Sequence, residues 1–187
     1  MDTKLYTIQE KGYADHILKK GLVIPVMLCE SRSLAQHLVN TGLEDPAILE
    51  INTEGLPNEF KQAAIDEDGD ELKSYMNEYV DYFTQSPIPA DHITKAELTD
   101  TNELGARVYS GMLSMKENVR SLGDMEEVAA GMRKLVNLGI SSKEHIDAEI
   151  ETAMDLVREG RFDELYDEED FADAVAGLST NNNGLEQ

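Results

Sequence analysis

The sequence contains one cysteine and no long hydrophobic run, and both scarcities exclude classes of protein. The single thiol, Cys29, cannot form an internal disulfide, which fits a reducing compartment. It lies beside the apolar run 22–28, so we expect a buried structural thiol rather than a nucleophile. No stretch approaches the roughly 18 apolar residues of a membrane span, and no apolar segment follows Met1. The sequence therefore predicts a cytoplasmic protein.

Basic residues are scarce as well. The chain has 16 Lys and Arg against 38 Asp and Glu, a formal net charge of -22, and both halves are acidic. Because binding to phosphates requires Lys and Arg, this balance disfavours direct contact with nucleic acid or with anionic membranes. Two interpretations of the charge remain. It keeps the protein monodisperse in solution, or it attracts a basic protein partner.

Metal-binding and nucleotide-binding motifs are also missing. There is no P-loop, no dinucleotide-binding GxGxxG and no GxSxG elbow. The acidic run 66–71 does not fit an EF-hand loop, because placing Gly69 at the sixth position leaves Ala64 first and Tyr75 twelfth. The four histidines form none of the spacings of a zinc site: His16, His37, His92 and His145. We expect no metal.

Strand and helix signals alternate in a regular order in the first half of the chain. Pro25 interrupts an apolar run, which indicates an edge strand or two short extended pieces. Ser33 with Gln36 has the form of a capping box that starts a helix. The predicted elements are a strand at 4–9, a helix at 13–20, an extended run at 22–28, a helix at 33–40 and a strand at 47–52.

The pattern then becomes helical. Residues 70–84 place apolar side chains at helical spacing, which predicts a helix that ends before Pro87 and Pro89. Residues 92–98 alternate like a last strand. Capping boxes at Asp100, Asp124 and Ser141 start three more helices. These are predicted at 101–122, 125–138 and 142–159, followed by a weaker helix at 168–178 and a disordered polar tail at 179–187.

These signals predict an α+β protein. Residues 1–98 form a small mixed sheet with short helices, residues 99–178 form an acidic α-helical extension, and residues 179–187 form a disordered tail.

Residues 1–98 contain five short sequence motifs whose order matches that of a known superfamily. They are Leu5-Tyr6-Thr7, the run 17–22 (ILKKGL), the run 31–35 (SRSLA), the run 48–56 with Leu49-Glu50-Ile51 at its centre, and the run 88–93 (IPADHI). In this order they resemble the ADP-ribosyltransferase-like superfamily, in particular the branch that contains RNA 2'-phosphotransferases and DNA-modifying ADP-ribosyltransferases. The resemblance covers about the first 100 residues and concerns mostly residues that build the fold.

The resemblance implies an NAD site and names its residues. Transferases of the family hold NAD with an early His or Arg and end with a catalytic Glu. This chain has Tyr6 and Arg32 at the cofactor-binding places, with Tyr6 stacking on the nicotinamide, and Glu97 as the catalytic carboxylate that orients the acceptor. The chain departs from the family in offering few basic residues for a pyrophosphate clamp.

Three functions follow as hypotheses. The preferred one is a non-catalytic binding or inhibitory module, an ADP-ribosyltransferase-like scaffold whose acidic residues engage a basic, nucleic-acid-binding surface of a partner. The second is NAD-dependent ADP-ribosyl transfer. The third is self-association through Met-rich helices at Met112, Met115, Met125 and Met132. The residues expected to contact the basic partner are Asp163, Glu164, Asp167, Glu168, Glu169 and Asp170.

Overall fold

The computed structural model of the chain describes residues 3–62 and 80–167. The chain divides into two compact units, Met1–Glu97 and Leu98–Gln187, and each is described by itself. The predicted weak helix at 168–178, the tail at 179–187 and the acidic run at 66–71 lie outside the described residues.

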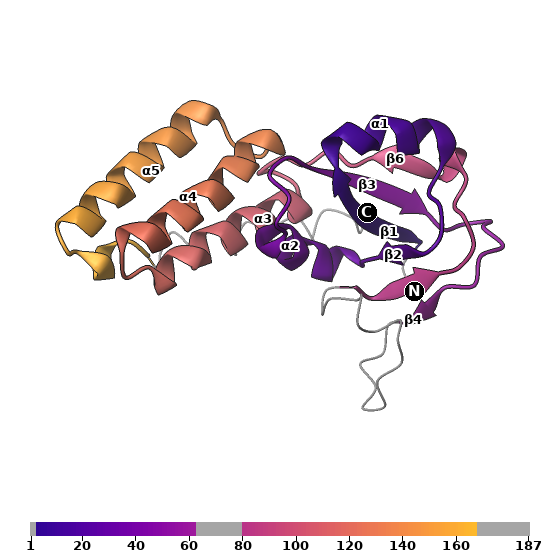
Figure 1. Cartoon of the computed structure of the whole chain (residues 1–187), viewed down its shortest axis with the longest axis horizontal. Coiled ribbons are helices and arrows are strands. Elements are labelled where there is room, and N and C mark those ends of the chain that lie inside the picture. Colours follow the sequence, from indigo (N-terminus) through magenta and orange to yellow (C-terminus); the bar gives the residue numbers. More distant parts are fainter. Residues whose placement is uncertain (1–2, 63–79, 168–187) are drawn as a thin grey trace, which may run out of the picture. The chain divides into compact units, whose positions relative to one another are not determined.

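The first unit contains two small sheets and two helices (Figure 1). One sheet has the strand order β1-β3-β6 and the other β2-β5-β4, and every adjacent pair is antiparallel. In chain order the elements are β1 (Lys4–Glu10), α1 (Lys11–Lys20), β2 (Val26–Leu28), α2 (Ser31–Asn40), β3 (Pro46–Asn52), β4 (Lys61–Gln62), β5 (Tyr82–Thr84), the 3₁₀ turn η2 (Ala90–His92) and β6 (Ile93–Lys95).

The α+β class is confirmed, but the mixed sheet predicted for this unit is wrong. A mixed sheet would need a helical crossover that returns the chain to a parallel neighbour in the same sheet. Here α1 and α2 instead connect strands of different sheets, β1 to β2 and β2 to β3. No parallel pair therefore arises among the described strands.

The alternation of β1 explains the core of this unit. Leu5 and Thr7 are buried on one face, where they lie opposite Ile51 and Leu49 of β3. Helix α1 contacts β1, β3 and β6, as Figure 1 shows. The residues buried in this cluster are Leu5, Ala14, Ile17, Leu22, Val26, Leu28, Ala47, Leu49, Ile51, Ile88 and Ile93.

The extended run 22–28 is two short pieces, one of the two alternatives that Pro25 suggested. Leu22 exchanges backbone hydrogen bonds with Ile88, whereas β2 begins only at Val26, after a cis Ile24–Pro25 bond. Cys29 in turn exchanges backbone hydrogen bonds with Tyr6, which links β2 to β1.

Two local predictions are wrong. The end of the predicted 70–84 helix forms strand β5, because Tyr82–Thr84 pairs with both β2 and β4, and tertiary pairing overrides the helical spacing. Ser33 does not cap α2, which begins at Ser31 after Glu30. The Ser33 hydroxyl instead donates a 2.9 Å hydrogen bond to Asp81 Oδ1.

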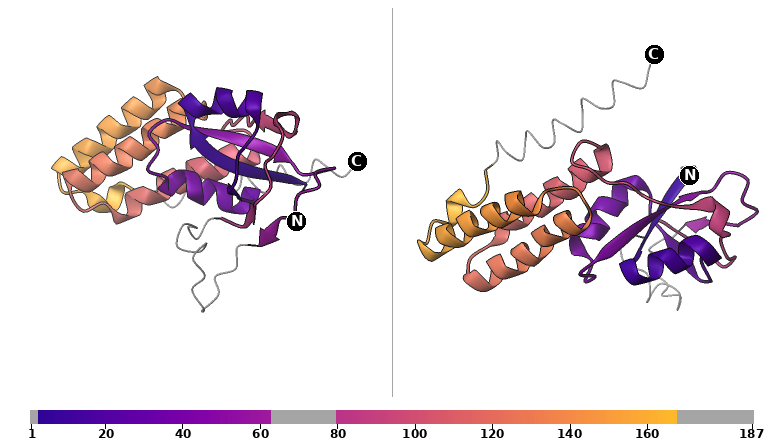
Figure 2. Two further views of the ribbon diagram at one scale, coloured as in Figure 1. Left: turned by 45° about the vertical axis from the view of Figure 1, so that its right-hand side comes forward. Right: turned by 90° about the horizontal axis from the view of Figure 1, so that it is seen from above.

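The second unit is helical in its described part. It comprises α3 (Glu103–Ser114), the 3₁₀ turn η3 (Met115–Asn118), α4 (Leu122–Asn137), α5 (Lys143–Arg158) and the 3₁₀ turn η4 (Phe162–Glu164). Figures 1 and 2 show α4 and α5 running side by side. The N-caps are Asn102, Ser121 and Ser142, each with a side-chain oxygen that accepts from a backbone N–H three residues on. All three predicted helices are present, but the helix predicted at 101–122 ends at Ser114 and is followed by η3, and the caps lie one to three residues from the expected positions.

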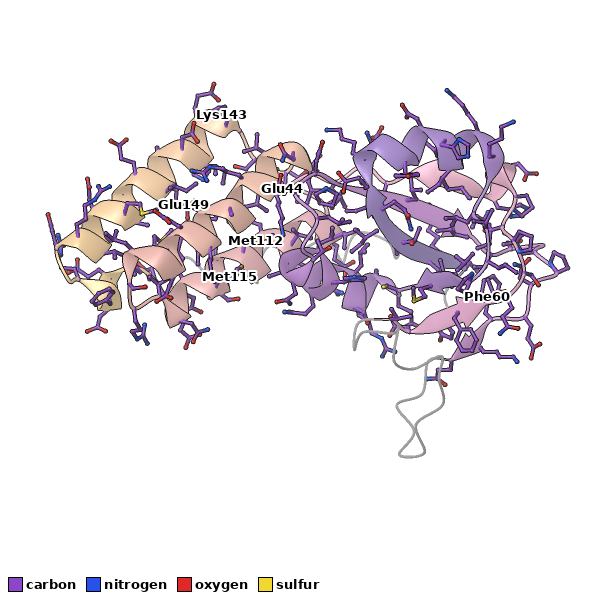
Figure 3. The ribbon with its side chains drawn as sticks, in the orientation of Figure 1. Glu44, Phe60, Met112, Met115, Lys143 and Glu149 are labelled. Atoms are coloured by element: carbon purple, nitrogen blue, oxygen red, sulfur yellow. The ribbon has the colours of Figure 1, made fainter. Side chains whose placement is uncertain are left out.

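The methionines of this unit lie inside it. The sulfur atoms of Met112 and Met115 approach α4 at Gly131, and Figure 3 shows both side chains next to that helix. Met112, Met125 and Met132 are fully buried. These three side chains are therefore part of the core of this unit, and Met115 is half-buried. Among the described helices, none is both long and apolar enough to cross a membrane.

Candidate functional site

A pocket of about 570 Å³ opens in the first unit beside the start of the chain. We name it the β1–α1 pocket. Its walls come from β1, from one face of α1, from the 21–27 segment that carries the cis proline, and from α2. Helical spacing places His16 and Lys20, four residues apart, on the same side of α1, and both line the pocket.

The charge of this pocket differs from that of the whole protein. None of the described residues that line it is Asp or Glu, although the chain carries 38 of these residues. The lining includes the ammonium of Lys20 and the imidazoles of His16 and His37. Lys20 and His16 form no ion pair with any residue that the structure describes. The pocket therefore favours a negatively charged ligand.

The mouth of the pocket is apolar and exposed. The lining residues Tyr13, Val23 and Met27 are 67%, 81% and 38% exposed, and Ile24 beside them is 54% exposed. Of the large hydrophobic residues exposed in the described part of the chain, only Leu122 lies elsewhere. Exposed apolar groups gathered at a pocket are typical of ligand sites. They suit the planar, apolar part of a ligand.

Two polar side chains of β1 and a tightly packed glycine form part of the pocket wall. Thr7 is buried, and its hydroxyl oxygen accepts a 3.0 Å hydrogen bond from the side-chain amide of Gln9. Gly21, also in the lining, has φ of 86°, and a Cβ there would lie 2.3 Å from the Ile88 carbonyl oxygen. Only glycine fits at that position.

Cys29 and His37 meet in this pocket, with Cys29 Sγ 3.4 Å from His37 Nδ1. Burial, followed by the negative charge of Asp81, raises the pKa of the Cys29 thiol to about 12. Burial also lowers the pKa of His37, so the imidazole is neutral at pH 7. Which of the two atoms donates is set by the tautomer of the neutral His37 ring. Cys29 is buried, as predicted, and a protonated thiol in such a place is a poor nucleophile.

The residues assigned to NAD from the family resemblance lie outside this pocket. Tyr6 is adjacent in β1 to Thr7 and so faces the opposite side of the sheet. Arg32 is exposed in the first turn of α2 and pairs with Glu30, with Nε 2.7 Å from Oε2. Glu97 is exposed beyond the end of β6. None of the three lines the β1–α1 pocket.

Arg32 belongs to a hydrogen-bonded group that holds α2 to β5. Asp81 Oδ2 accepts from the backbone N–H of Glu30 at 2.8 Å, and Oδ1 accepts from the Ser33 hydroxyl. The Tyr82 hydroxyl donates to Glu30 Oε1 at 2.8 Å. A carboxylate at this place satisfies the free N–H groups of a helix N-terminus and complements its dipole. These polar residues therefore stabilise the fold.

The six acidic residues expected to contact a partner are described only in part. Glu168, Glu169 and Asp170 lie outside the described residues. Asp163 is exposed, as is Glu164, whose carboxylate accepts from Arg161 Nε at 2.7 Å and also bonds the terminal nitrogen Nη2. Arg161 also pairs with Glu159 at 2.8 Å. The arginine therefore neutralises part of the negative charge at this place.

A more regular set of acids lies on α5, and we name it the α5 acidic row. Its four members are exposed and follow each other at intervals of three or four residues, so they share one face of the helix: Glu144, Asp147, Glu151 and Asp155. Asp147 pairs with Lys143, and Asp155 pairs with Arg158 at 2.6 Å. Glu144 and Glu151 have no ion-pair partner among the described residues. The helical spacing of these acids is present in the sequence, but it is less conspicuous there than the denser acidic run at 163–170.

No group of three or more His, Cys, Asp or Glu side chains in the described ranges is arranged to hold a metal ion. Comparison with family models, with curated proteins and with solved structures gives no match to this chain.

Proposed function

We propose that this protein is a binding module rather than an enzyme, and that its first unit, on an ADP-ribosyltransferase-like scaffold, binds an anionic ligand of nucleotide type such as NAD. The observation that carries the proposal is the β1–α1 pocket. It combines an unpaired ammonium at Lys20, the imidazole of His16, and an apolar mouth at Tyr13 and Met27. A phosphate group fits the basic side chains of Lys20 and His16, and a planar ring fits the apolar mouth.

The net charge of -22 does not argue against an anionic ligand. At physiological ionic strength the Debye length is about 8 Å, so distant surface carboxylates are largely screened. The groups that line the pocket decide its local potential, and the described ones are neutral or positive. The global charge slows the approach of an anion more than it weakens the bound state.

Binding without transfer follows from the missing carboxylate. Transfer of an ADP-ribosyl group needs a carboxylate near the reacting carbon and the acceptor. The described lining has none, and Glu97 lies outside it. The Cys29 thiol is not a substitute, because it stays protonated at neutral pH.

The first prediction concerns Lys20. Replacing Lys20 with glutamine is expected to weaken NAD binding about tenfold, because a charge-assisted hydrogen bond contributes about 1.5–3 kcal/mol and 1.4 kcal/mol is a factor of ten. Isothermal titration calorimetry measures the change. The control is Lys19→Gln, which removes the same charge from the same last turn of α1 without touching the pocket and should change affinity less than twofold.

Two results would contradict this proposal. A wild-type protein that shows neither a thermal shift nor titration heat with millimolar NAD would exclude the ligand. Release of nicotinamide by the wild-type protein would exclude the binding-only function and favour the transferase alternative.

A second candidate function is the docking of a basic protein partner on the acidic second unit. The α5 acidic row supports it, because Glu144 and Glu151 are exposed carboxylates without ion-pair partners in the described part of the chain. Such a surface steers a basic partner and fixes its orientation. The partner-contact proposal for Asp163, Glu164 and Asp167 stands beside it, although Glu164 is already held by Arg161.

The second prediction tests this surface by charge reversal. The variant Glu144→Lys/Glu151→Lys is expected to bind a 12-residue Lys-Ser peptide about tenfold more weakly at low salt, since each exposed ion pair contributes up to about 1 kcal/mol. Fluorescence anisotropy at low and physiological salt should show the difference shrinking as salt rises. The matched variant Asp15→Lys/Glu54→Lys makes the same change of net charge on the first unit. Equal loss in both variants would show that only the total charge matters.

A further inference from the structure

We infer that a second pocket, between α3 and α5, docks a basic amphipathic peptide segment of a partner protein. This inference rests on the second candidate function and names the place where such a partner inserts. The pocket has a volume of about 990 Å³ and lies within the second unit. We name it the α3–α5 pocket.

Each helix presents one continuous face to this pocket. Ala106, Tyr109 and Leu113 of α3 recur at intervals of three and four residues. Six residues of α5, from His145 to Leu156, line the pocket and share one face of that helix. At 1.5 Å per residue this part of α5 runs for roughly 16 Å, which matches three turns of a docked helix. A pocket that runs along two helices and has both apolar and charged lining residues suits an amphipathic segment.

The α5 face of the pocket is distinct from the α5 acidic row. Counting about 100° per residue around the helix, the pocket residues such as Thr152 lie roughly a third of a turn from the row residue Glu151. The buried residues Ile146, Ile150 and Val157 occupy a third face, which packs in the core. Glu149, which lines the pocket, and the α5 acidic row can therefore be mutated separately.

Charge inside the pocket favours a cationic occupant. The charged groups that line it are the ammonium of Lys116 and the carboxylates of Asp100, Glu149, Glu164 and Asp167. Lys116 is 8% exposed and is engaged by Glu149 Oε1. Figure 3 shows Glu149 on α5 beside the neighbouring helices. The ammonium is thus already neutralised, and Glu164 is held by Arg161. This leaves the exposed carboxylate of Asp100, which has no ion-pair partner among the described residues, for a cationic occupant to balance.

The second oxygen of Glu149 is the specific anchor. Glu149 Oε2 is buried and has no hydrogen-bond partner. His145 Nε2 lies 3.7 Å from this oxygen, which is beyond hydrogen-bond distance. The His145 side chain is 58% exposed, so it can turn away without disturbing the core. A Lys or Arg side chain that enters here satisfies Oε2, and the apolar side chains on the same peptide face contact Tyr109, Leu113 and Leu156.

Three fluorescein-labelled 12-residue peptides test the inference with the full-length protein. The first has Leu at every third or fourth position and Lys elsewhere, the second replaces Lys with Glu, and the third replaces Leu with Ser. We expect only the Leu-Lys peptide to bind in the micromolar range, measured by fluorescence anisotropy at physiological salt. Equal binding of the Lys-Ser peptide, or no binding of any peptide, would overturn the inference.

Variants assign the binding to the pocket. Glu149→Gln is expected to weaken the Leu-Lys peptide tenfold or more, because it removes a charge-assisted hydrogen bond. The variant also breaks the pair with Lys116, so its affinity is measured under conditions in which circular dichroism shows it to be folded. Glu151→Gln makes the same change on the acidic row and should alter affinity less than twofold. Thr152→Arg places a bulky cation in the pocket from an exposed position, leaves the Glu149 pair untouched, and should abolish binding.

The failure of this inference is distinguishable from failure of the second candidate function. If Glu151→Gln weakens the Leu-Lys peptide as much as Glu149→Gln does, the acidic row binds and the pocket does not. If Thr152→Arg binds the peptide as well as the wild type, the pocket is not the site. Concentration-dependent sedimentation that Thr152→Arg abolishes would identify a second copy of this chain as the occupant, and would overturn the partner assignment.

Discussion

Replacing Lys116 with methionine is expected to destabilise the second unit by about 3 kcal/mol. Lys116 is 8% exposed, and its ammonium is the partner of Glu149 Oε1. Removing one member of a buried ion pair leaves the other charge uncompensated, which costs about 3–5 kcal/mol. Glu149 is 19% exposed, so some water reaches it and the lower end of the range applies. Urea unfolding, followed by circular dichroism, measures the loss.

The double variant Lys116→Met/Glu149→Leu separates the charge from the packing. Because two apolar side chains of similar size replace the pair, its stability should return to within about 1 kcal/mol of the wild type. Lys143→Met is the matched control, since it breaks an exposed pair with Asp147 and should cost less than about 0.5 kcal/mol. A loss as small for Lys116→Met as for Lys143→Met would show that the ion pair does not hold η3 to α5.

Local patterns in the sequence predicted the elements whose own residues decide them. The β1 strand alternates clearly, and α4 and α5 have apolar stripes, capping residues and terminal glycines. Gly139 and Gly160, which follow these two helices in the sequence, have φ of 72° and 76°, a conformation in which glycine is favoured. For these elements the local signal and the tertiary packing agree.

The sequence did not predict the elements that depend on distant partners. Phe83 continues the helical spacing of the segment 70–84, yet Tyr82–Thr84 is a strand because β2 and β4 lie on either side of it. Antiparallel pairing throughout both sheets likewise depends on which strands each helix connects. A residue pattern records the period of a segment but not the identity of its neighbours.

The candidate sites show the same division. His16 and Lys20 share a helix face, which the sequence makes visible, but their meeting with His37 and Thr7 depends on the packing of α1, α2 and β1. A pocket whose described lining has no carboxylate was not predictable from a composition with 38 acidic residues. The family resemblance directed attention to Tyr6, Arg32 and Glu97, which lie outside the pocket.

Replacing Gly105 with alanine is expected to cost about 2 kcal/mol, although alanine favours helices. Gly105 lies in the first turn of α3, where a Cβ would be 1.6 Å from the Thr99 carbonyl oxygen and 3.1 Å from Asn102 Oδ1. The obstacle is backbone, so either the 99–102 turn or the helix start must move, and overpacking of this kind costs about 1–3 kcal/mol or more. The alanine gains about 0.8–1 kcal/mol of helix propensity, which offsets only part of a clash this severe.

Gly123→Ala supplies the comparison that isolates the clash. Gly123 occupies the first turn of α4, and a Cβ there would meet only Ser121 Oγ, at 3.6 Å. The same substitution should therefore stabilise the protein by up to about 1 kcal/mol, because only the propensity term remains. If the free energy of unfolding in urea falls for Gly105→Ala and rises for Gly123→Ala, the close approach of Thr99 determines the residue at position 105. If both variants gain stability, the close packing of the 99–102 turn against α3 is wrong. The Asp100 and Thr101 wall of the α3–α5 pocket would then have to be placed differently.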